Sequence, residues 1–148
     1  MVYANAVGAY SAGGRLTISS VPLGNQMPQA IEMIFHEASH TDELEQPLRA
    51  GLSDAFRAAG VEEPERFWHD VIFFTSGEIT RLVLAEHGEP GYQHYGTLGV
   101  YRRGERWAKQ LPAFEAHWQP FLESRSREAG DRREALEALV APLFAKDE

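Results

Sequence analysis

Apolar residues alternate with polar ones near the N-terminus, and they recur at helical spacing through most of the remaining chain. Leu16 and Ile18 alternate with polar neighbours just after a Gly-Gly pair, so residues 2–20 predict a β-hairpin. From Pro28 onward, apolar residues return every three or four positions, which is typical of amphipathic helices. The pattern therefore predicts an α+β, mostly helical fold, with an N-terminal β-hairpin followed by about five helices.

Prolines and glycines set the expected limits of these helices, since proline suits a first helical turn and glycine often follows a last one. Pro47 is expected to separate the first helix from the second. The apolar stripes of the last two helices, which include Trp107, Phe114 and Leu136, are expected to form the core. The helices are expected at about residues 28–42, 47–59, 65–86, 106–126 and 131–145, with a long loop over 88–104.

The first predicted helix combines an apolar pattern with a metal-binding pattern. Its sequence His36-Glu37-Ala38-Ser39-His40 fits H-E-x-x-H, in which two histidines lie one turn and about 40° apart, so that both imidazoles can reach one ion. Glu37 flanks that face and can act as a general base toward water on the ion. The alternative is two capped or solvated helix histidines. The apolar positions of this helix are Ile31, Ile34, Phe35 and Ala38.

The segment from Ile34 to Thr41 resembles the active-site helix of the zincin metallopeptidases, and the similarity extends over about residues 15–80. The resemblance implies a minimal zincin-like domain with a zinc ion (Zn²⁺), bound by His36, His40 and a third protein ligand. The metzincin extension is absent. The gluzincins use a glutamate on a later helix, and Ser76-Gly77-Glu78 is similar to their pattern. The stretch from Trp68 to Glu78 also resembles a group of uncharacterised bacterial proteins.

Glu78 is the preferred third ligand, because it lies in an apolar helix where an ionised carboxylate is costly unless it is paired or bound to a cation. Gly77 beside it would permit the close approach of another helix. The alternative is that Glu78 pairs with Arg81, three residues later. His69 is the rival ligand, and it can also be a core histidine with a hydrogen bond. Nine residues separate His69 from Glu78, so the two point to opposite sides of the helix and cannot easily face one ion.

The glycine-rich loop over residues 88–104 contains aromatic side chains that could donate a hydrogen bond to an oxyanion, as a His or Tyr does in zincins. Tyr95 is the preferred donor. The other candidates are Tyr92, His94 and Tyr101. The alternative is that these aromatic residues only seal the loop against the core.

Composition narrows the class of protein further. The 148 residues are enough for a single domain, with 43% hydrophobic residues to fill its core. A net charge of -8 argues against a nucleic-acid partner, and no apolar run approaches the roughly 20 residues that span a bilayer. Because cysteine is absent, any metal must be held by His and carboxylate. We expect a cytoplasmic protein as written, with export from a longer precursor left open.

Together these features predict a zinc-dependent hydrolase, a metallopeptidase that cleaves a peptide or small amide with Glu37 as general base. One alternative is a non-catalytic, zincin-like binding or scaffold protein with a structural metal or none. Another is a metal-dependent protein with non-peptide chemistry. A purely structural site needs the histidines but not Glu37, so the glutamate favours catalysis. The substrate and the oligomeric state are not predicted by the sequence.

Overall fold

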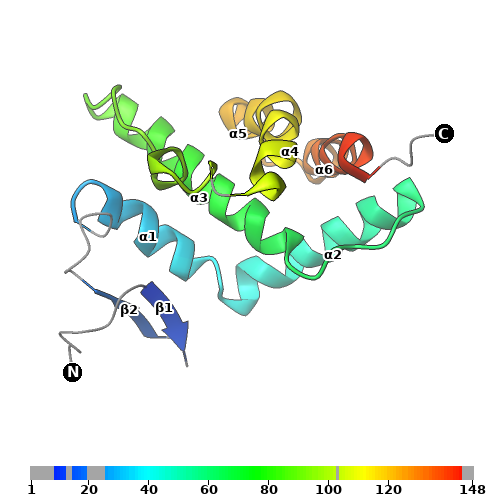
Figure 1. Cartoon of the computed structure of the whole chain (residues 1–148), viewed down its shortest axis with the longest axis horizontal. Coiled ribbons are helices and arrows are strands. Elements are labelled where there is room, and N and C mark those ends of the chain that lie inside the picture. Colours follow the sequence, from blue (N-terminus) through cyan, green and yellow to red (C-terminus); the bar gives the residue numbers. More distant parts are fainter. Residues whose placement is uncertain (1–8, 13–14, 20–25, 103, 145–148) are drawn as a thin grey trace.

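The computed structural model describes residues 9–12, 15–19, 26–102 and 104–144 (Figure 1). This part of the chain is mostly helical, which confirms the helical character expected from the sequence. Its helices are α1 (Gln29–Ala38), α2 (Asp42–Ala59), α3 (Phe67–Glu86), α4 (Glu105–Ala113), α5 (Gln119–Ser124) and α6 (Ala129–Phe144). Among the described residues, no helix has the length and apolar character needed to cross a membrane.

Two short strands precede the helices. β1 (Ala9–Ala12) pairs antiparallel with β2 (Arg15–Ile18), with Ala9 opposite Ile18 and Ala12 opposite Arg15. Both strands pack against α1 (Figure 1). The turn expected at residues 13–14 lies outside the described residues.

The expected helix break at Pro47 is wrong. The chain leaves the helical path at residues 39–41, and α2 begins at Asp42, so that Pro47 lies inside this helix. Three acidic residues in the first turn, Asp42, Glu43 and Glu45, favour a helix start at this point because the N-terminal end of the helix dipole is positive. Pro47 lies in the second turn and removes one backbone hydrogen bond from a helix of 18 residues.

The apolar core lies between α2, α3, α6 and the segment from α4 to α5. Between α4 and α5 the backbone forms a π-helical turn, Phe114–Trp118, instead of the uninterrupted helix expected there. Phe114 is fully buried and lies against Phe67 and Phe74 of α3. The stripe residues Trp107, Trp118 and Leu136 also belong to this core, as the sequence predicts.

The helix α1 lies apart from this core, against α3 and the strands (Figure 1). The sequence correctly predicts a helix here, but the prediction of its buried face is wrong. Ile34 and Phe35 are 46% and 47% exposed, whereas Glu32, His36 and Glu37 are buried. The reason is that the neighbouring surface of α3, together with the loop after it, presents polar side chains toward α1. The buried side of α1 is therefore a polar one.

Candidate metal centre

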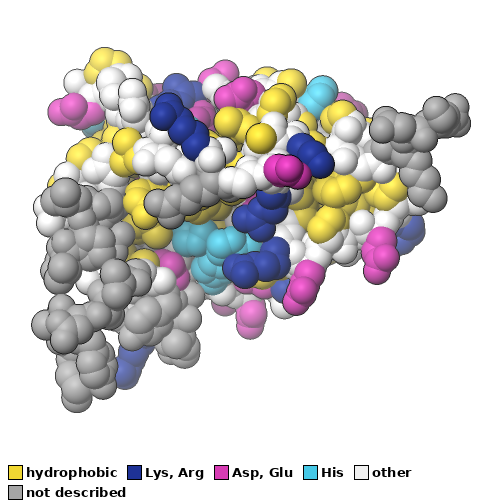
Figure 2. All heavy atoms as spheres, in the orientation of Figure 1, with side chains coloured by type: hydrophobic (Ala, Val, Ile, Leu, Met, Phe, Trp, Pro, Cys, Tyr) yellow, Lys and Arg dark blue, Asp and Glu magenta, His cyan; other side chains and the backbone are white. Residues whose placement is uncertain are grey.

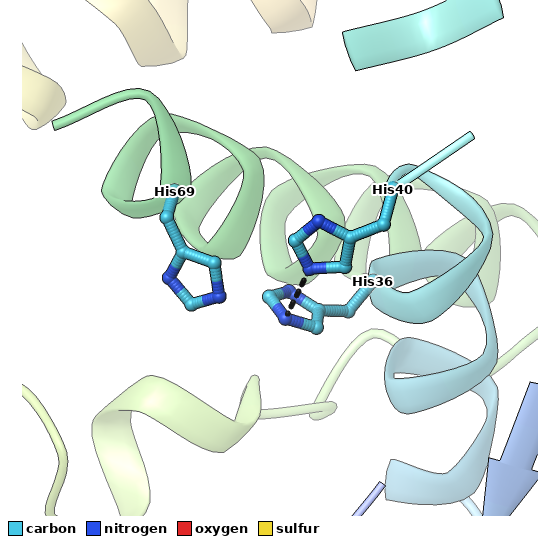
Figure 3. A group of neighbouring side chains, drawn as sticks. All are labelled: His36, His40 and His69. Atoms are coloured by element: carbon cyan, nitrogen blue, oxygen red, sulfur yellow. Dashed lines mark hydrogen bonds between the residues drawn. The ribbon is translucent and has the colours of Figure 1, made fainter. Parts of the chain in front are cut away.

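Three histidine side chains converge where α1 ends and α3 begins. His36 lies in the last turn of α1, His40 follows that helix directly, and His69 lies in the first turn of α3. Figure 3 shows the three imidazoles facing a common space. One nitrogen of each ring lies within 4.8 Å of a nitrogen of both others, which makes the three residues a candidate metal site.

The two histidines of the H-E-x-x-H pattern have the spacing that one ion requires. The Nε2 atoms of His36 and His40 lie 3.4 Å apart, as the dashed line in Figure 3 marks. Two nitrogens bound to one tetrahedral zinc ion at about 2.0–2.1 Å are separated by about 3.3–3.4 Å. These two nitrogens would therefore need little rearrangement to bind one zinc ion.

Burial and the neighbouring charges keep His36 and His69 of this cluster uncharged. Burial lowers the pKa of His36 to about 3, with further lowering by the neighbouring His69 and His40. Burial lowers the pKa of His69 to about 4, and charge repulsion from His40, Arg66 and Arg106 contributes in the same direction. Both imidazoles are therefore neutral at pH 7, and neutral imidazole is the form that binds a metal ion.

The imidazole of His40 is oriented by a series of contacts on its side away from the cluster. Its Nδ1 lies 3.5 Å from Glu45 Oε2, and Glu45 Oε1 accepts a hydrogen bond of 2.9 Å from Arg49 Nη1. The Arg49 guanidinium lies 4.9 Å from the ring centroid of Trp68. A carboxylate at Nδ1 leaves Nε2 to face the cluster, which is the usual arrangement around a histidine that binds a metal.

The cluster opens into a wide surface cavity of about 600 Å³. Figure 2 shows histidine side chains gathered on this face of the molecule. Glu37 is only 5% exposed, and it belongs to the cavity wall together with the three histidines. The remaining lining residues are Ala9, Met33 and Phe73.

The structure brings His69 to the two histidines, and it places Glu78 elsewhere. Glu78 Oε2 accepts hydrogen bonds of 2.9 and 2.7 Å from Nε and Nη2 of Arg81, and Glu78 Oε1 lies 3.2 Å from His94 Nε2. Burial acts to raise the pKa of Glu78, but these contacts outweigh it and hold the pKa below its ordinary value. Glu78 is thus a paired carboxylate, as in the alternative that couples it to Arg81.

Gly77 allows the close approach of His94, not of another helix as expected. A Cβ atom on Gly77 would lie 2.7 Å from His94 Nδ1 and 2.8 Å from His94 Cβ. The missing side chain therefore lets an imidazole from the loop, rather than another helix, pack directly on the α3 backbone. This position allows His94 to reach Glu78.

The aromatic residues of the loop after α3 close it against α1 and α3. The Tyr92 hydroxyl and the Tyr95 backbone N–H both donate a hydrogen bond to Glu32 Oε2, and each donor–acceptor distance is 2.7 Å. Tyr101 Oη lies 3.3 Å from His94 Nδ1, and burial raises the pKa of both Tyr92 and Tyr101, so their hydroxyls stay protonated. These contacts agree with the alternative in which the loop aromatics form a seal.

Tyr95, the preferred oxyanion donor, lies one ring away from the histidine cluster. Its ring centroid is 6.3 Å from that of Phe73, and Phe73 is in turn 5.7 Å from the His36 ring. A catalytic role for Tyr95 therefore stays a prediction.

Glu32 is the residue of this region that the sequence analysis missed. It is 1% exposed and holds two groups of the loop through one oxygen. The signal was its position four residues before His36, which places both side chains on one helix face. The apolar face expected for α1 did not include Glu32, so its burial was not expected.

Comparison of the chain with family models, curated proteins and solved structures gives no match. The similarity to zincins therefore depends on the residues of this chain alone.

Proposed function

We propose that this protein is a zinc-dependent hydrolase whose ion is bound by His36, His40 and His69. The observation that supports the proposal best is the convergence of three imidazole nitrogens within 4.8 Å, two of them already at tetrahedral spacing. Three nitrogen ligands and an open fourth position are characteristic of catalytic rather than structural zinc sites. The cavity beside the cluster leaves room for that fourth ligand.

Three imidazoles differ from the two histidines and glutamate of the gluzincin pattern. Neutral ligands contribute no negative charge, so the full charge of the ion remains available to polarise a carbonyl and to lower the pKa of water. Glu37 lies in the wall of the same cavity, where its carboxylate would take the proton of the attacking water and pass it to the leaving amine. Peptides or small amides are the proposed substrates.

The zincin-like character of the domain belongs to the same proposal. Its support is that the H-E-x-x-H helix packs beside the helix with the third ligand, while the two strands lie against the first of these helices. Tyr95 is the candidate oxyanion donor, because its ring lies against Phe73 and the hydroxyls of Tyr92 and Tyr101 already contact Glu32 and His94.

The test combines metal analysis with a peptide-library cleavage assay on wild type and Glu37→Gln. We expect one zinc per chain in both proteins and cleavage by wild type alone, since the substitution removes the base but none of the ligands. Glu62→Gln is the matched control, because Glu62 is exposed and does not line the cavity. This control should cleave like wild type.

Two outcomes would contradict the proposal in different ways. Zinc at one per chain without cleavage of any peptide or amide would favour the binding or scaffold alternative. Absence of zinc binding in wild type would remove the metal site itself.

A further inference from the structure

The buried face of α1 places a carboxylate one helical turn before a ligand histidine. Glu32 and His36 are 1% and 6% exposed, and their spacing of four residues places them on the same side of the helix. Glu32 Oε2 is occupied by the Tyr92 hydroxyl and the Tyr95 N–H. The other carboxylate oxygen, Oε1, has no hydrogen-bond partner in the described part of the chain.

Unpaired buried polar atoms are rare in this structure, and two of them belong to this helix face. Within the described residues, the buried side-chain atoms without a hydrogen-bond partner are Glu32 Oε1, His36 Nδ1 and Gln110 Oε1. Each such atom has lost its hydrogen bonds to water without a replacement, so a native protein is expected to have a use for it. An acceptor on Glu32 and a ring nitrogen on His36 are complementary when that nitrogen carries a proton.

The second nitrogen of the His36 ring explains why Nδ1 should carry that proton. His36 Nε2 faces His40 Nε2 across 3.4 Å, so Nε2 is the atom aimed at the ion. A histidine that binds metal through Nε2 must have its proton on Nδ1, and Nδ1 usually donates it to a carboxylate, a carbonyl or water. His40 already has this arrangement, with Glu45 Oε2 at its Nδ1.

His94, the other imidazole near Glu32, is already engaged. His94 Nε2 lies 3.2 Å from Glu78 Oε1, and His94 Nδ1 lies 3.3 Å from the Tyr101 hydroxyl. Both of its nitrogens therefore have partners. His36 is the imidazole on this helix face with a nitrogen to offer to Glu32 Oε1.

We propose that Glu32 is a positioning residue for the metal site, whose Oε1 accepts a hydrogen bond from His36 Nδ1–H. The two atoms are not bonded in the structure, so a side-chain rotation or one bridging water completes the contact. This inference rests on the proposed zinc site. Because Oε2 of the same carboxylate holds Tyr92 and Tyr95, Glu32 also joins the loop after α3 to the metal ligand.

Glu32→Gln tests this role with almost no change in shape. The Tyr92 hydroxyl and Tyr95 N–H would hold the amide oxygen, which turns the amide NH₂ group toward His36 Nδ1. A donor at this position favours the opposite imidazole tautomer, in which Nε2 carries the proton and cannot bind zinc. We expect zinc affinity, measured by competition with a chelator, to fall about 10- to 100-fold.

Tyr92→Phe is the matched control, because it removes a hydrogen bond from Glu32 Oε2 and leaves Oε1 unchanged. Its zinc affinity should stay within about threefold of wild type if Glu32 acts through His36. A second readout needs no metal. Nitrogen-15 NMR of the metal-free protein should show the proton of His36 on Nδ1 in wild type and on Nε2 in Glu32→Gln.

The outcomes separate this inference from the proposed function. An unchanged zinc affinity or an unchanged His36 tautomer in Glu32→Gln would overturn the role of Glu32 while the zinc site stands. An equal loss of zinc affinity in Tyr92→Phe would also overturn it, because Glu32 would then act through the loop. A wild type that binds no zinc but shows the tautomer change would instead contradict the proposed function alone.

Discussion

The two sides of α3 show how one helix can serve both stability and chemistry. On the side toward α2 and α6, Phe67, Val71 and Phe74 are buried among other apolar side chains. On the side toward α1, His69 joins the histidine cluster. Apolar burial on the first side stabilises the folded state. Burial of ionisable groups on the second side destabilises it, because these groups lose their hydration.

The buried ionisable groups on and around α3 are either paired or unpaired. Glu78 has partners for both oxygens, so its burial is compensated. His36 and Glu32 each retain a buried atom without a partner. Departures from complete pairing of this kind are expected at functional sites rather than in structural cores. The difference supports the proposal that the histidine cluster and its neighbour Glu32 are the functional part of this interface.

The largest expected effect comes from breaking the apolar side. Phe114→Ala should lower the free energy of unfolding by about 3–5 kcal/mol, because it leaves a cavity next to Phe67 and Phe74. Chemical denaturation measures this change. The folded variant should still bind zinc with wild-type affinity. Leu98→Ala, at a side chain that is 55% exposed, is the control and should change stability by less than about 0.5 kcal/mol. A loss below 1 kcal/mol in Phe114→Ala would contradict the assigned core.

A smaller effect should appear on the polar side as the pH falls. The folded pKa of His36 is about 3, far below its ordinary value of 6.5, so only the unfolded chain gains a proton between these values. Stability of the metal-free protein should therefore decrease as the pH falls below 6.5. When the pH falls from 6.5 to 5, the free energy of unfolding should decrease by about 2 kcal/mol less in His36→Gln than in wild type. Denaturation at several pH values measures this difference, and parallel curves for the two proteins would argue against a neutral, buried His36.

The smallest effect concerns the contact between α3 and the loop. Gly77→Ala should lower the free energy of unfolding by about 1–2 kcal/mol, since its Cβ would displace His94 from Glu78. Gly130→Ala is the matched helical control, because a Cβ there meets no atom within 4 Å. This control should be neutral or stabilising by up to about 1 kcal/mol. If both glycine variants behave alike, the packing of His94 on α3 is not important for stability.

Local patterns predict the helices of this protein better than they predict what each helix faces. The spacing of apolar residues identifies α3 and the core residues Phe114 and Leu136, because these positions follow one dominant apolar stripe. The same rule fails for α1, where the partner surface is polar and the apolar residues Ile34 and Phe35 remain exposed. A single sequence contains no information about which neighbour a helix will meet.

The candidate site divides in the same way. Helix geometry predicts the pairing of His36 with His40. The structure places their Nε2 atoms together although His40 lies just beyond the end of α1. The choice between His69 and Glu78 depends on how α3 is rotated against α1, which no local pattern reports. The nine-residue spacing predicts that the two side chains point to opposite sides of α3. Of the two, the structure brings His69 to the histidine pair. Glu32 was missed because its importance depends on loop residues that lie 60 and 63 positions away in the chain.

The most direct test of the central claim is zinc X-ray absorption spectroscopy of the zinc-loaded protein. The structure leads us to expect three imidazole ligands and one oxygen at about 2.0–2.1 Å. His69→Gln should remove one imidazole from this set, whereas Glu78→Gln should leave the spectrum unchanged. A wild-type spectrum with two imidazoles or fewer, or one that changes in Glu78→Gln, would contradict the three-histidine site.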